Sequence, residues 1–483
     1  SAYVQDEFYA TDDLMLMLGL RYDWYTSSDK PTFNPGFNSR YGFSNQENLD
    51  GISLLQPRVG FTWSAAPNLD IRGGIGLYSG GNPNVWISNS YSNDGITNIQ
   101  LRKNNVNLFT EALSGAGLPL YNVPQSLVDG VSNASGDGQV NSIDPDFEVP
   151  SEWKYALGAS YVTAGDYRLS ADAIFSKKRN SAIVRDVALR DSGRDAPDGR
   201  PIYERIAGRS GEIMLTNVSG SDGDSLVLSL AAGKDFASGF SVSAGYAYME
   251  TEEVNPMTSS VAGSNYGNVA LSDPGNPGAE TSNYEIPHRL TLTLGYSREF
   301  IAGYATRLNL FASANEGRPY SYTFSRSDGA FGDANFFSNG RQLLYVPADN
   351  DPNVVYGAGF DRAAFNQFIR AEGLDQYRGE ILPRNSLNAD WWFKADLRIE
   401  QEIPGFFSGN KGSVFLVVKN LGNLLNDEWG ILKQGSFVGE GVVATSINAD
   451  GKYVYNSFNA PSMQTVQNAA SLWEARFGVK YTF

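Results

Sequence analysis

The chain has 483 residues, no cysteine, a single histidine and a formal net charge of −16. The lack of cysteine excludes disulfides, cysteine-ligated zinc, iron–sulfur clusters and thiol nucleophiles, and the acidic balance lacks the clustered Lys and Arg of a nucleic-acid-binding protein. No window holds the roughly 18 uninterrupted apolar residues of a membrane-spanning helix. Aromatic residues still make up 13% of the chain, and 51 residues are glycine.

Alternation of apolar and polar residues predicts strands of roughly 9–13 residues, about the length that a tilted strand needs to cross a bilayer. In the second of these segments, Leu18, Leu20 and Tyr22 share one face, whereas Gly19 and Arg21 share the other. One face suits lipid and the other suits water. In chain order, the predicted strands span 2–10, 13–25, 52–64, 68–80, 151–163, 166–189, 212–235, 239–251, 287–300, 303–316, 388–403, 411–421 and 472–483. The sixth and seventh are long enough to project beyond a membrane, and Ser219–Asp224 is expected to form a bulge.

The connections between these strands alternate between short and long. The short ones, rich in Gly, Pro, Asp and Asn, span 10–13, 64–68, 163–166, 235–239, 301–303 and 404–411. The long ones span 26–51, 80–150, 251–286, 317–387 and 422–471. Short periplasmic turns and long extracellular loops are typical of an outer-membrane barrel, whereas a soluble β-sandwich has no reason to segregate its loops. The expected fold is an all-β, antiparallel transmembrane barrel in the bacterial outer membrane.

The strand count predicts that further strands belong to the same barrel. Single-chain bacterial barrels have even strand numbers because both chain ends lie in the periplasm, and about thirteen is odd. An open sheet would leave two unpaired edges in lipid. We therefore expect residues 1–483 to be the carboxyl-terminal portion of one barrel domain, completed by early strands or by a complementary chain.

Five stretches spread over the chain together resemble a known family. They are AYVQDEFYATDDLMLMLGLRYDWY (2–25), QPRVGFTWSAAPNLDIRGGIGLYSGGNPNVW (56–86), DPDFEVPSEWKYALGASY (144–161), IPHRLTLTLGYSREF (286–300) and KNLGNLLNDEWG (419–430). In this order they resemble the TonB-dependent receptors, in particular their Oar-like branch. The resemblance implies a barrel of about 22 strands, filled by an amino-terminal plug that contacts the TonB system. Neither the plug nor the TonB-contacting segment is found in these residues.

The last eight residues resemble the signal that the barrel-assembly machinery reads. Arg476, Gly478, Tyr481 and Phe483 stand at its polar, glycine and two aromatic positions. A final strand with an exposed edge and outward aromatics suits pairing with an insertase by strand addition. The alternative is that Phe483 is only an aromatic residue of the membrane interface.

The segment 133–144 follows the spacing of an EF-hand calcium loop, with oxygen ligands at positions 1, 3, 5, 9 and 12, Gly at 6 and a backbone carbonyl at 7. The expected ligands are Asn133, Ser135, Asp137, Gln139, Asn141 and Asp144. Only two of them carry charge, and no flanking helices are evident, so any calcium affinity is expected to be weak. The alternative is a Gly/Asn/Asp turn before a strand.

Charged residues of the strands are expected to line the barrel interior. By alternation, this face carries Arg21, Arg72, Asp172, Asp396, Arg398, Glu400, Arg476 and Lys480. We interpret them as wall charges, solvated or paired with a plug, in preference to a substrate pathway. His288 is expected to be an interfacial strand residue, because no partner set for a metal or for catalysis accompanies it.

Recognition is expected in the long loops, 81–150 and 317–387 above all, since loops on a rigid scaffold usually carry it. Tyr320, Tyr322 and Phe324 lie there among Gly, Ser and Asn, a combination that suits an extracellular protein, peptide or glycan ligand.

The favoured function is active transport across the outer membrane, of the TonB-dependent type, with ligand binding at the extracellular loops. Two alternatives stay open: a passive porin or structural barrel, and an adhesion barrel that presents its loops to a partner protein. No enzyme activity is expected, because no nucleophile–base set is evident. The expected partners are outer-membrane lipid, the barrel-assembly machinery, the TonB system and the ligand, without nucleic acid. Calcium is the one candidate cofactor.

Overall fold

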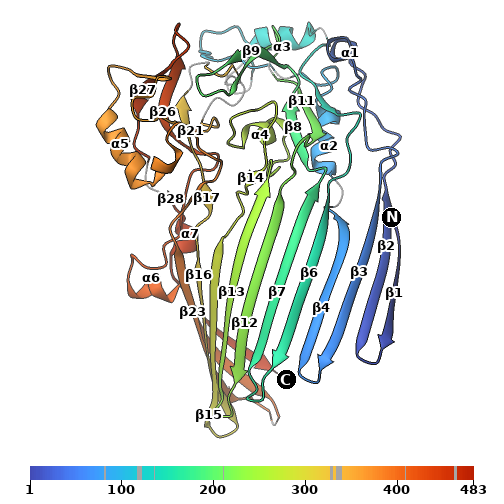
Figure 1. The fold of residues 1–483 in the computed structure, drawn as a ribbon, viewed down its shortest axis with the longest axis vertical. Coiled ribbons are helices and arrows are strands. Elements are labelled where there is room, and N and C mark those ends of the chain that lie inside the picture. The colour runs from blue at the N-terminus through green and yellow to red at the C-terminus, as the bar shows by residue number, and fades with distance from the viewer. Residues whose placement is uncertain are drawn as a thin grey trace.

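A computed structural model describes residues 1–80, 83–99, 101–116, 122–134, 136–209, 211–326, 330–332, 340–407, 409–461 and 465–482. In this part of the chain, thirteen long strands follow one another in a single antiparallel sheet (Figure 1). They are β1 (Ala2–Thr11), β2 (Leu14–Trp24), β3 (Ser53–Ala66), β4 (Leu69–Ser79), β6 (Ser151–Val162), β7 (Arg168–Arg179), β12 (Asp224–Asp235), β13 (Phe240–Glu253), β15 (His288–Ile301), β16 (Tyr304–Asn315), β23 (Trp392–Pro404), β24 (Lys411–Lys419) and β29 (Glu474–Thr482).

The sheet forms a curved, open wall. Figure 1 shows the long connections gathered at one end of the strands and the short turns at the other. Among the described residues, β1 and β29 each pair with one neighbour, β2 and β24 respectively, so the wall does not close on itself. The amino-terminal end of β1 lies at the loop end of the wall, and the chain leaves β29 at the turn end.

The register of the strands separates an apolar face from a polar face. Residues directly opposite each other in a sheet share a face, and Leu16 lies opposite Phe61, while Leu416 lies opposite Phe477 at the other edge of the wall. On the other face of β2, which is polar, Arg21 lies opposite Gln56. The two-residue period expected from the sequence is therefore kept across the whole wall.

Two predicted strands are wrong in their length. The predicted strands 166–189 and 212–235 are each broken: β7 ends at Arg179, before the left-handed Asn180 (φ 55°), and β12 begins only at Asp224, after Gly223 (φ 89°). The segment Ser219–Asp224 thus separates β11 from β12, and the expected bulge within one continuous strand is wrong. The outer pieces are β8 (Ala182–Asp186) and β11 (Ile213–Asn217), and β11 pairs with both β8 and β5 (Asn141–Ile143) in a separate sheet.

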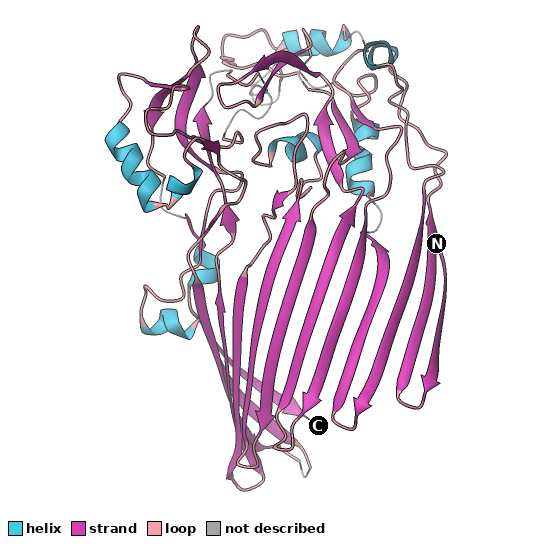
Figure 2. Ribbon diagram, in the orientation of Figure 1, coloured by secondary structure: helices cyan, strands magenta, loops and turns pink. Residues whose placement is uncertain are grey.

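The long connections are folded, with helices and small sheets of their own (Figure 2). The helices are α1 (Pro35–Tyr41), α2 (Asn84–Ser92), α3 (Gln125–Ser132), α4 (Ala262–Gly267), α5 (Arg362–Ala371), the 3-10 helix η1 (Leu374–Tyr377), α6 (Leu421–Leu425) and α7 (Asn468–Ser471). The further short strands are β9 (Leu189–Asp195), β10 (Pro201–Arg205), β14 (Glu280–Thr281), β17 (Pro319–Tyr320), β18 (Tyr322–Arg326), β19 (Tyr345–Val346), β20 (Val354–Tyr356), β21 (Glu380–Ile381), β22 (Leu387–Asn388), β25 (Lys433–Gln434), β26 (Glu440–Ile447), β27 (Tyr453–Phe458) and β28 (Thr465–Val466). No helix of the described residues has both the length and the apolarity needed to cross a membrane.

The two clusters of buried apolar side chains lie among these connections and not in the wall. The larger one joins β18, β26, β27 and α5, and includes Phe324, Phe365 and Tyr455. The second joins β5, β8 and β11 to α4, and includes Ile143 and Tyr266. Because buried apolar area is the main stabilising contribution to a fold, the connections form an ordered layer above one end of the wall.

Candidate functional site

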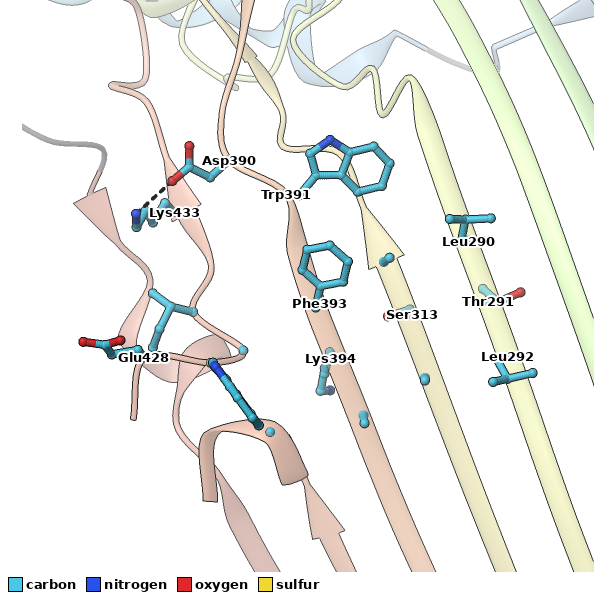
Figure 3. Close-up of a pocket in the computed structure, with 17 residues that line it drawn as sticks. Leu290, Thr291, Leu292, Ser313, Asp390, Trp391, Phe393, Lys394, Glu428 and Lys433 are labelled. Atoms are coloured by element: carbon cyan, nitrogen blue, oxygen red, sulfur yellow. Dashed lines mark hydrogen bonds and ion pairs between the residues drawn. The ribbon is translucent and has the colours of Figure 1, made fainter. Parts of the chain in front are cut away.

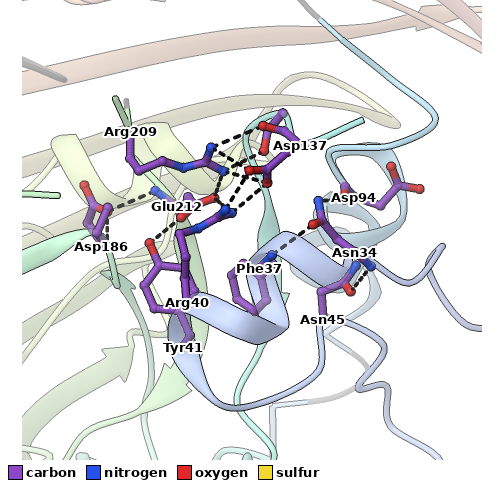
Figure 4. Close-up of polar contacts among 12 residues, drawn as sticks. Asn34, Phe37, Arg40, Tyr41, Asn45, Asp94, Asp137, Asp186, Arg209 and Glu212 are labelled. Carbon is purple, nitrogen blue, oxygen red and sulfur yellow. Dashed lines mark hydrogen bonds and ion pairs between the residues drawn. The ribbon is translucent and has the colours of Figure 1, made fainter. Parts of the chain in front are cut away.

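Three connections meet at the carboxylate of Asp137 (Figure 4). Arg40 of α1 donates two hydrogen bonds to it, at 2.7 and 2.9 Å, and Arg209 donates another at 3.2 Å. Both arginines also donate to the carboxylate of Glu212, at 3.0 and 2.5 Å, and the hydroxyl of Tyr41 donates to this Glu212 carboxylate as well. The hydrogen bonds from Arg40 lower the pKa of Asp137, while burial raises the pKa of Tyr41. The result is a charge cluster, which we call the Asp137 cluster, that ties α1 to two later connections.

The segment predicted as a calcium loop contributes to this cluster. Asn133 caps the end of α3, Gln139 precedes β5, and Asn141 begins β5; Ser135 lies outside the described residues. Asp144 accepts a hydrogen bond from Thr216 at 2.5 Å. Among the described residues, no group of three or more His, Cys, Asp or Glu side chains is placed to hold a metal ion. Calcium binding here stays a prediction, and an ion would have to compete with two arginines for Asp137.

A polar pocket of about 360 Å³ lies where the connections 254–287, 316–391 and 420–473 meet. Its lining includes two tyrosines, four side-chain amides and one arginine: Tyr284, Tyr320, Asn283, Asn385, Gln434, Gln467 and Arg318. We call it the loop pocket. Short pairings position these residues, because Tyr320 of β17 lies opposite Leu387 of β22, and Gln434 of β25 lies opposite Thr465 of β28.

The floor of the loop pocket is held rigidly. The amide of Asn385 donates to Asn283 and to the carbonyl of Thr281, at 2.5 and 2.8 Å, from a left-handed backbone with φ 57°. Non-glycine residues in that conformation are uncommon and cluster at sites where the surroundings hold them. A side chain at Gly435 would collide with Tyr320, so only glycine fits there.

Arg318 gives the loop pocket a positive charge. Its guanidinium lies over the ring of Tyr284, 5.7 Å from the centroid, and the side chain is exposed. Within the residues that the structure describes, no carboxylate is paired with it. Amides, hydroxyls and a cation offer hydrogen bonds to a polar ligand, and the aromatic rings offer flat apolar contact.

Of the three aromatic residues predicted to meet a ligand, only Tyr320 lines the loop pocket. Tyr322 and Phe324 are 2% and 1% exposed and belong to the larger apolar cluster, so the expectation of ligand contact is wrong for these two. Alternation along β18 could not reveal this, because both faces of that strand are covered by other connections. Sequence reasoning also missed Arg318, Asn283, Asn385 and Gln434, since no local motif marks them.

The charges on the polar face of the wall pair with each other. Arg72 bridges to Asp172 on a neighbouring hairpin at 2.5 Å, and Arg398 bridges to Glu400 at 2.5 Å. Asp396 pairs with Lys394 at 3.2 Å. These pairs agree with the interpretation of wall charges, because each arginine already has a carboxylate partner within the sheet.

The comparisons with known proteins place this architecture in a family. A family model described as an outer membrane beta barrel domain matches residues 1–412. The chain belongs to the outer-membrane β-barrel family. It is thus a multi-pass outer-membrane protein, and the fold and location expected from the strand pattern are confirmed; the Oar-like branch stays a prediction. No curated protein matches the sequence.

Several solved structures are similar to this outer-membrane barrel at low identity. The outer membrane transporter YddB from Escherichia coli is 11% identical, with 97% of this chain and 43% of that chain covered and a TM-score of 0.43. The FrpB iron transporter from Neisseria meningitidis is 12% identical, with 100% and 44% covered and a TM-score of 0.44. The siderophore receptor PirA from Pseudomonas aeruginosa is 11% identical, with 87% and 44% covered and a TM-score of 0.37. The chain spans less than half of the length of each.

Because the chain belongs to this family, the environment of each face and end of the barrel wall can be assigned. The apolar face contacts lipid, and the long connections are the extracellular loops. His288 begins β15 at the loop end of the apolar face, where its ring stacks on Trp391 at 6.4 Å and accepts or donates a hydrogen bond with Tyr246 at 2.8 Å. It therefore lies in a group of aromatic residues at the loop end of β15, and its position at the membrane interface stays a prediction.

The residues of the predicted assembly signal have structural partners in the barrel. Arg476 pairs with Glu474, and a side chain at Gly478 would collide with the ring of Phe415. The hydroxyl of Tyr481 accepts hydrogen bonds from the turn 405–410, at 3.1 and 3.2 Å. Phe483 lies outside the described residues. Recognition by the assembly machinery stays a prediction.

Proposed function

We propose that the whole protein is a TonB-dependent-type transporter of the outer membrane, which binds a polar ligand in the loop pocket before moving it across the membrane. The observation that carries the proposal is the loop pocket itself, in which three folded extracellular loops bring Arg318, four amides and two tyrosines to one cavity. A passive porin needs no such preformed polar cavity in its loops. The family resemblance of the sequence supports the same mode of transport.

The chemistry of the loop pocket favours a peptide or glycan that carries an anionic group. Side-chain amides donate to and accept from hydroxyl or peptide groups, tyrosine rings pack on flat surfaces, and a guanidinium binds carboxylate or phosphate. The pocket volume of about 360 Å³ matches a small ligand or one residue of a larger ligand.

The mode of transport is tested on the full-length protein. In planar bilayers, a plugged transporter shows no steady current, whereas a porin conducts continuously. In cells, photo-cross-linking is expected to capture TonB. A steady open-channel current together with no TonB cross-link would contradict the proposal.

The binding site is tested separately, with arrays of peptides and of acidic glycans. Arg318→Ala is expected to weaken binding about tenfold or more, because a hydrogen bond to a charged group is lost. Arg362→Ala is a matched control, since Arg362 also lies over a tyrosine ring, that of Tyr356, but outside the loop pocket. Equal effects of the two variants would assign binding to another part of the loops.

A further inference from the structure

A groove of about 770 Å³ lies on the membrane side of the wall (Figure 3). Its floor is formed by the loop ends of three neighbouring strands, which also contribute Thr291, Ser313 and Lys394 to the lining. The apolar side chains of the floor are Leu290 and Leu292 of β15, Ala312 and Ala314 of β16, and Phe393 and Ala395 of β23. The register places Leu290 opposite Ala314, and Ala314 opposite Phe393, so the floor is part of the lipid-facing surface. The groove therefore opens on the lipid-facing side of the wall.

The other side of the groove is formed by the segment 419–430, one of the stretches that carries the family resemblance. Gly422, Glu428, Trp429 and Gly430 line the groove, followed by Ile431 and Lys433. Figure 1 shows α6, which begins this segment, standing outside the line of the wall strands. Small alanines in the floor, opposite a protruding segment, leave the hollow between them.

The polar residues of this segment hold it in place. The amide of Asn420 donates to the carbonyls of Gly430 and Ser471, at 3.0 and 2.6 Å. The amide of Asn423 donates to the carbonyls of Asp427 and Trp429, at 3.2 and 3.1 Å, and the indole of Trp392 donates to Gly430 at 3.0 Å. The segment is thus tied to itself and to the wall by its polar groups.

Its apolar side chains, by contrast, are turned outward. Leu425 is 71% exposed and Trp429 is 56% exposed, although Asn420 and Asn423 hold the backbone of this segment in place. Exposing large apolar side chains to water is unfavourable. On the lipid-facing side of an outer-membrane barrel, by contrast, lipid solvates such side chains.

We propose that the groove binds an acyl chain of an outer-leaflet membrane lipid. The floor is continuous with the lipid-facing wall, so hydrocarbon reaches the groove without crossing water. Above it, Figure 3 shows the ion pair between Asp390 and Lys433, 2.8 Å apart, at the rim. An acyl chain in the groove packs against Phe393 and Trp429, while the lipid headgroup lies level with the charged rim.

The first test uses the full-length protein in phosphatidylcholine vesicles whose acyl chains carry bromine, which quenches tryptophan fluorescence on contact. The emission of Trp429 is obtained as the difference between the unmodified protein and Trp429→Phe. This emission is expected to be lost in brominated vesicles. Trp86, in an extracellular loop, is the control, and its emission, obtained in the same way, is expected to persist. Quenching of Trp429 by aqueous iodide but not by brominated lipid would overturn the proposal.

The second test fills the groove. Ala314→Phe places a ring on its floor, whereas Ala475→Phe places the same ring on the same face and at the same end of the wall, on β29. In native mass spectrometry of protein extracted from the outer membrane, Ala314→Phe is expected to lose a retained lipid that Ala475→Phe keeps. Equal retention by the two variants, or a polypeptide in place of the lipid, would contradict the assignment.

Discussion

Single charged residues in the extracellular loops are held by several hydrogen bonds and ion pairs at once. Arg200 is an example, since its guanidinium donates to Asp198 at 2.7 Å and to the carbonyl of Leu343 at 2.9 Å, and lies over the ring of Phe331. Both charges of the pair are almost fully buried. Removing one partner of a buried pair is costly because the other charge is left uncompensated. Such residues specify the arrangement of the loops.

The Asp137 cluster makes the stability of the loops depend on pH. The pKa of Asp137 is lowered by Arg40, so its contribution is fully present above the unfolded pKa of about 3.9 and is lost as the pH falls through the lower folded pKa. Asp137→Asn is expected to lower the stability of the loops by about 1 kcal/mol at neutral pH, because the partly exposed carboxylate is screened by water.

This prediction is checked by thermal unfolding of the wild type and the variant at several pH values. The difference between their Tm values is expected to shrink below about pH 4. Asp12→Asn, in an exposed turn of the wall, is the control and is expected to change Tm at no pH. A difference for Asp137→Asn that stays constant into acid would show that the ion pairs do not stabilise the loops.

At the scale of elements, β18 illustrates how a loop strand differs from a wall strand. Phe324 of β18 is 1% exposed and its ring lies 5.7 Å from Phe331 and 5.8 Å from Tyr453. A wall strand, by contrast, packs against no second layer in the described residues. The loop elements therefore depend on contacts between segments that lie far apart in the chain.

Truncating this core aromatic is expected to loosen the loop layer. Phe324→Ala should destabilise it by about 3–5 kcal/mol, the usual cost of removing a buried phenylalanine. Phe437→Ala removes the same side chain from a position that is 65% exposed and should change stability by less than about 0.5 kcal/mol. Hydrogen exchange of the segment 440–455 measures the difference. Equal exchange in the two variants would show that Phe324 does not stabilise the loop layer.

At the scale of the whole molecule, assembly in the outer membrane depends on how the last strand is used. If the terminal residues act as an assembly signal, the aromatic ring of Tyr481 matters and its hydroxyl does not. If Tyr481 acts only by holding the turn 405–410, the hydroxyl matters, because it accepts both hydrogen bonds from that turn.

We expect Tyr481→Phe to assemble like the wild type, whereas Tyr481→Ser and the deletion of Phe483 reduce the assembled amount, because outward aromatics favour strand addition at the insertase. The amount of heat-modifiable protein in isolated outer membranes measures this. Normal assembly after deletion of Phe483 would contradict the signal. Reduced assembly of Tyr481→Phe would favour the role in the turn.

The sequence by itself determined the wall of this protein. A period of two is a local property of a strand, so Leu18 and Arg21 reveal their faces without knowledge of any neighbour. The lengths of the connections then distinguished an outer-membrane barrel from a sandwich. The predictions of two long strands were wrong at Asn180 and Gly223, where residues with a left-handed backbone turn the chain out of the sheet.

Only the tertiary structure decided how the loops pack and which of their residues meet. Burial of Tyr322 and Phe324, the meeting of Asp137 with Arg40 and Arg209, and the gathering of Arg318 with Asn385 all depend on contacts between connections that are distant in sequence. No local periodicity predicts such contacts, because a loop packs against other loops in an irregular way and has no repeating alternation of faces like that of a strand. Each strand of the wall can be predicted from its own residues, whereas the loop pocket and the groove beside the segment 419–430 form only when the loops pack against one another and against the wall.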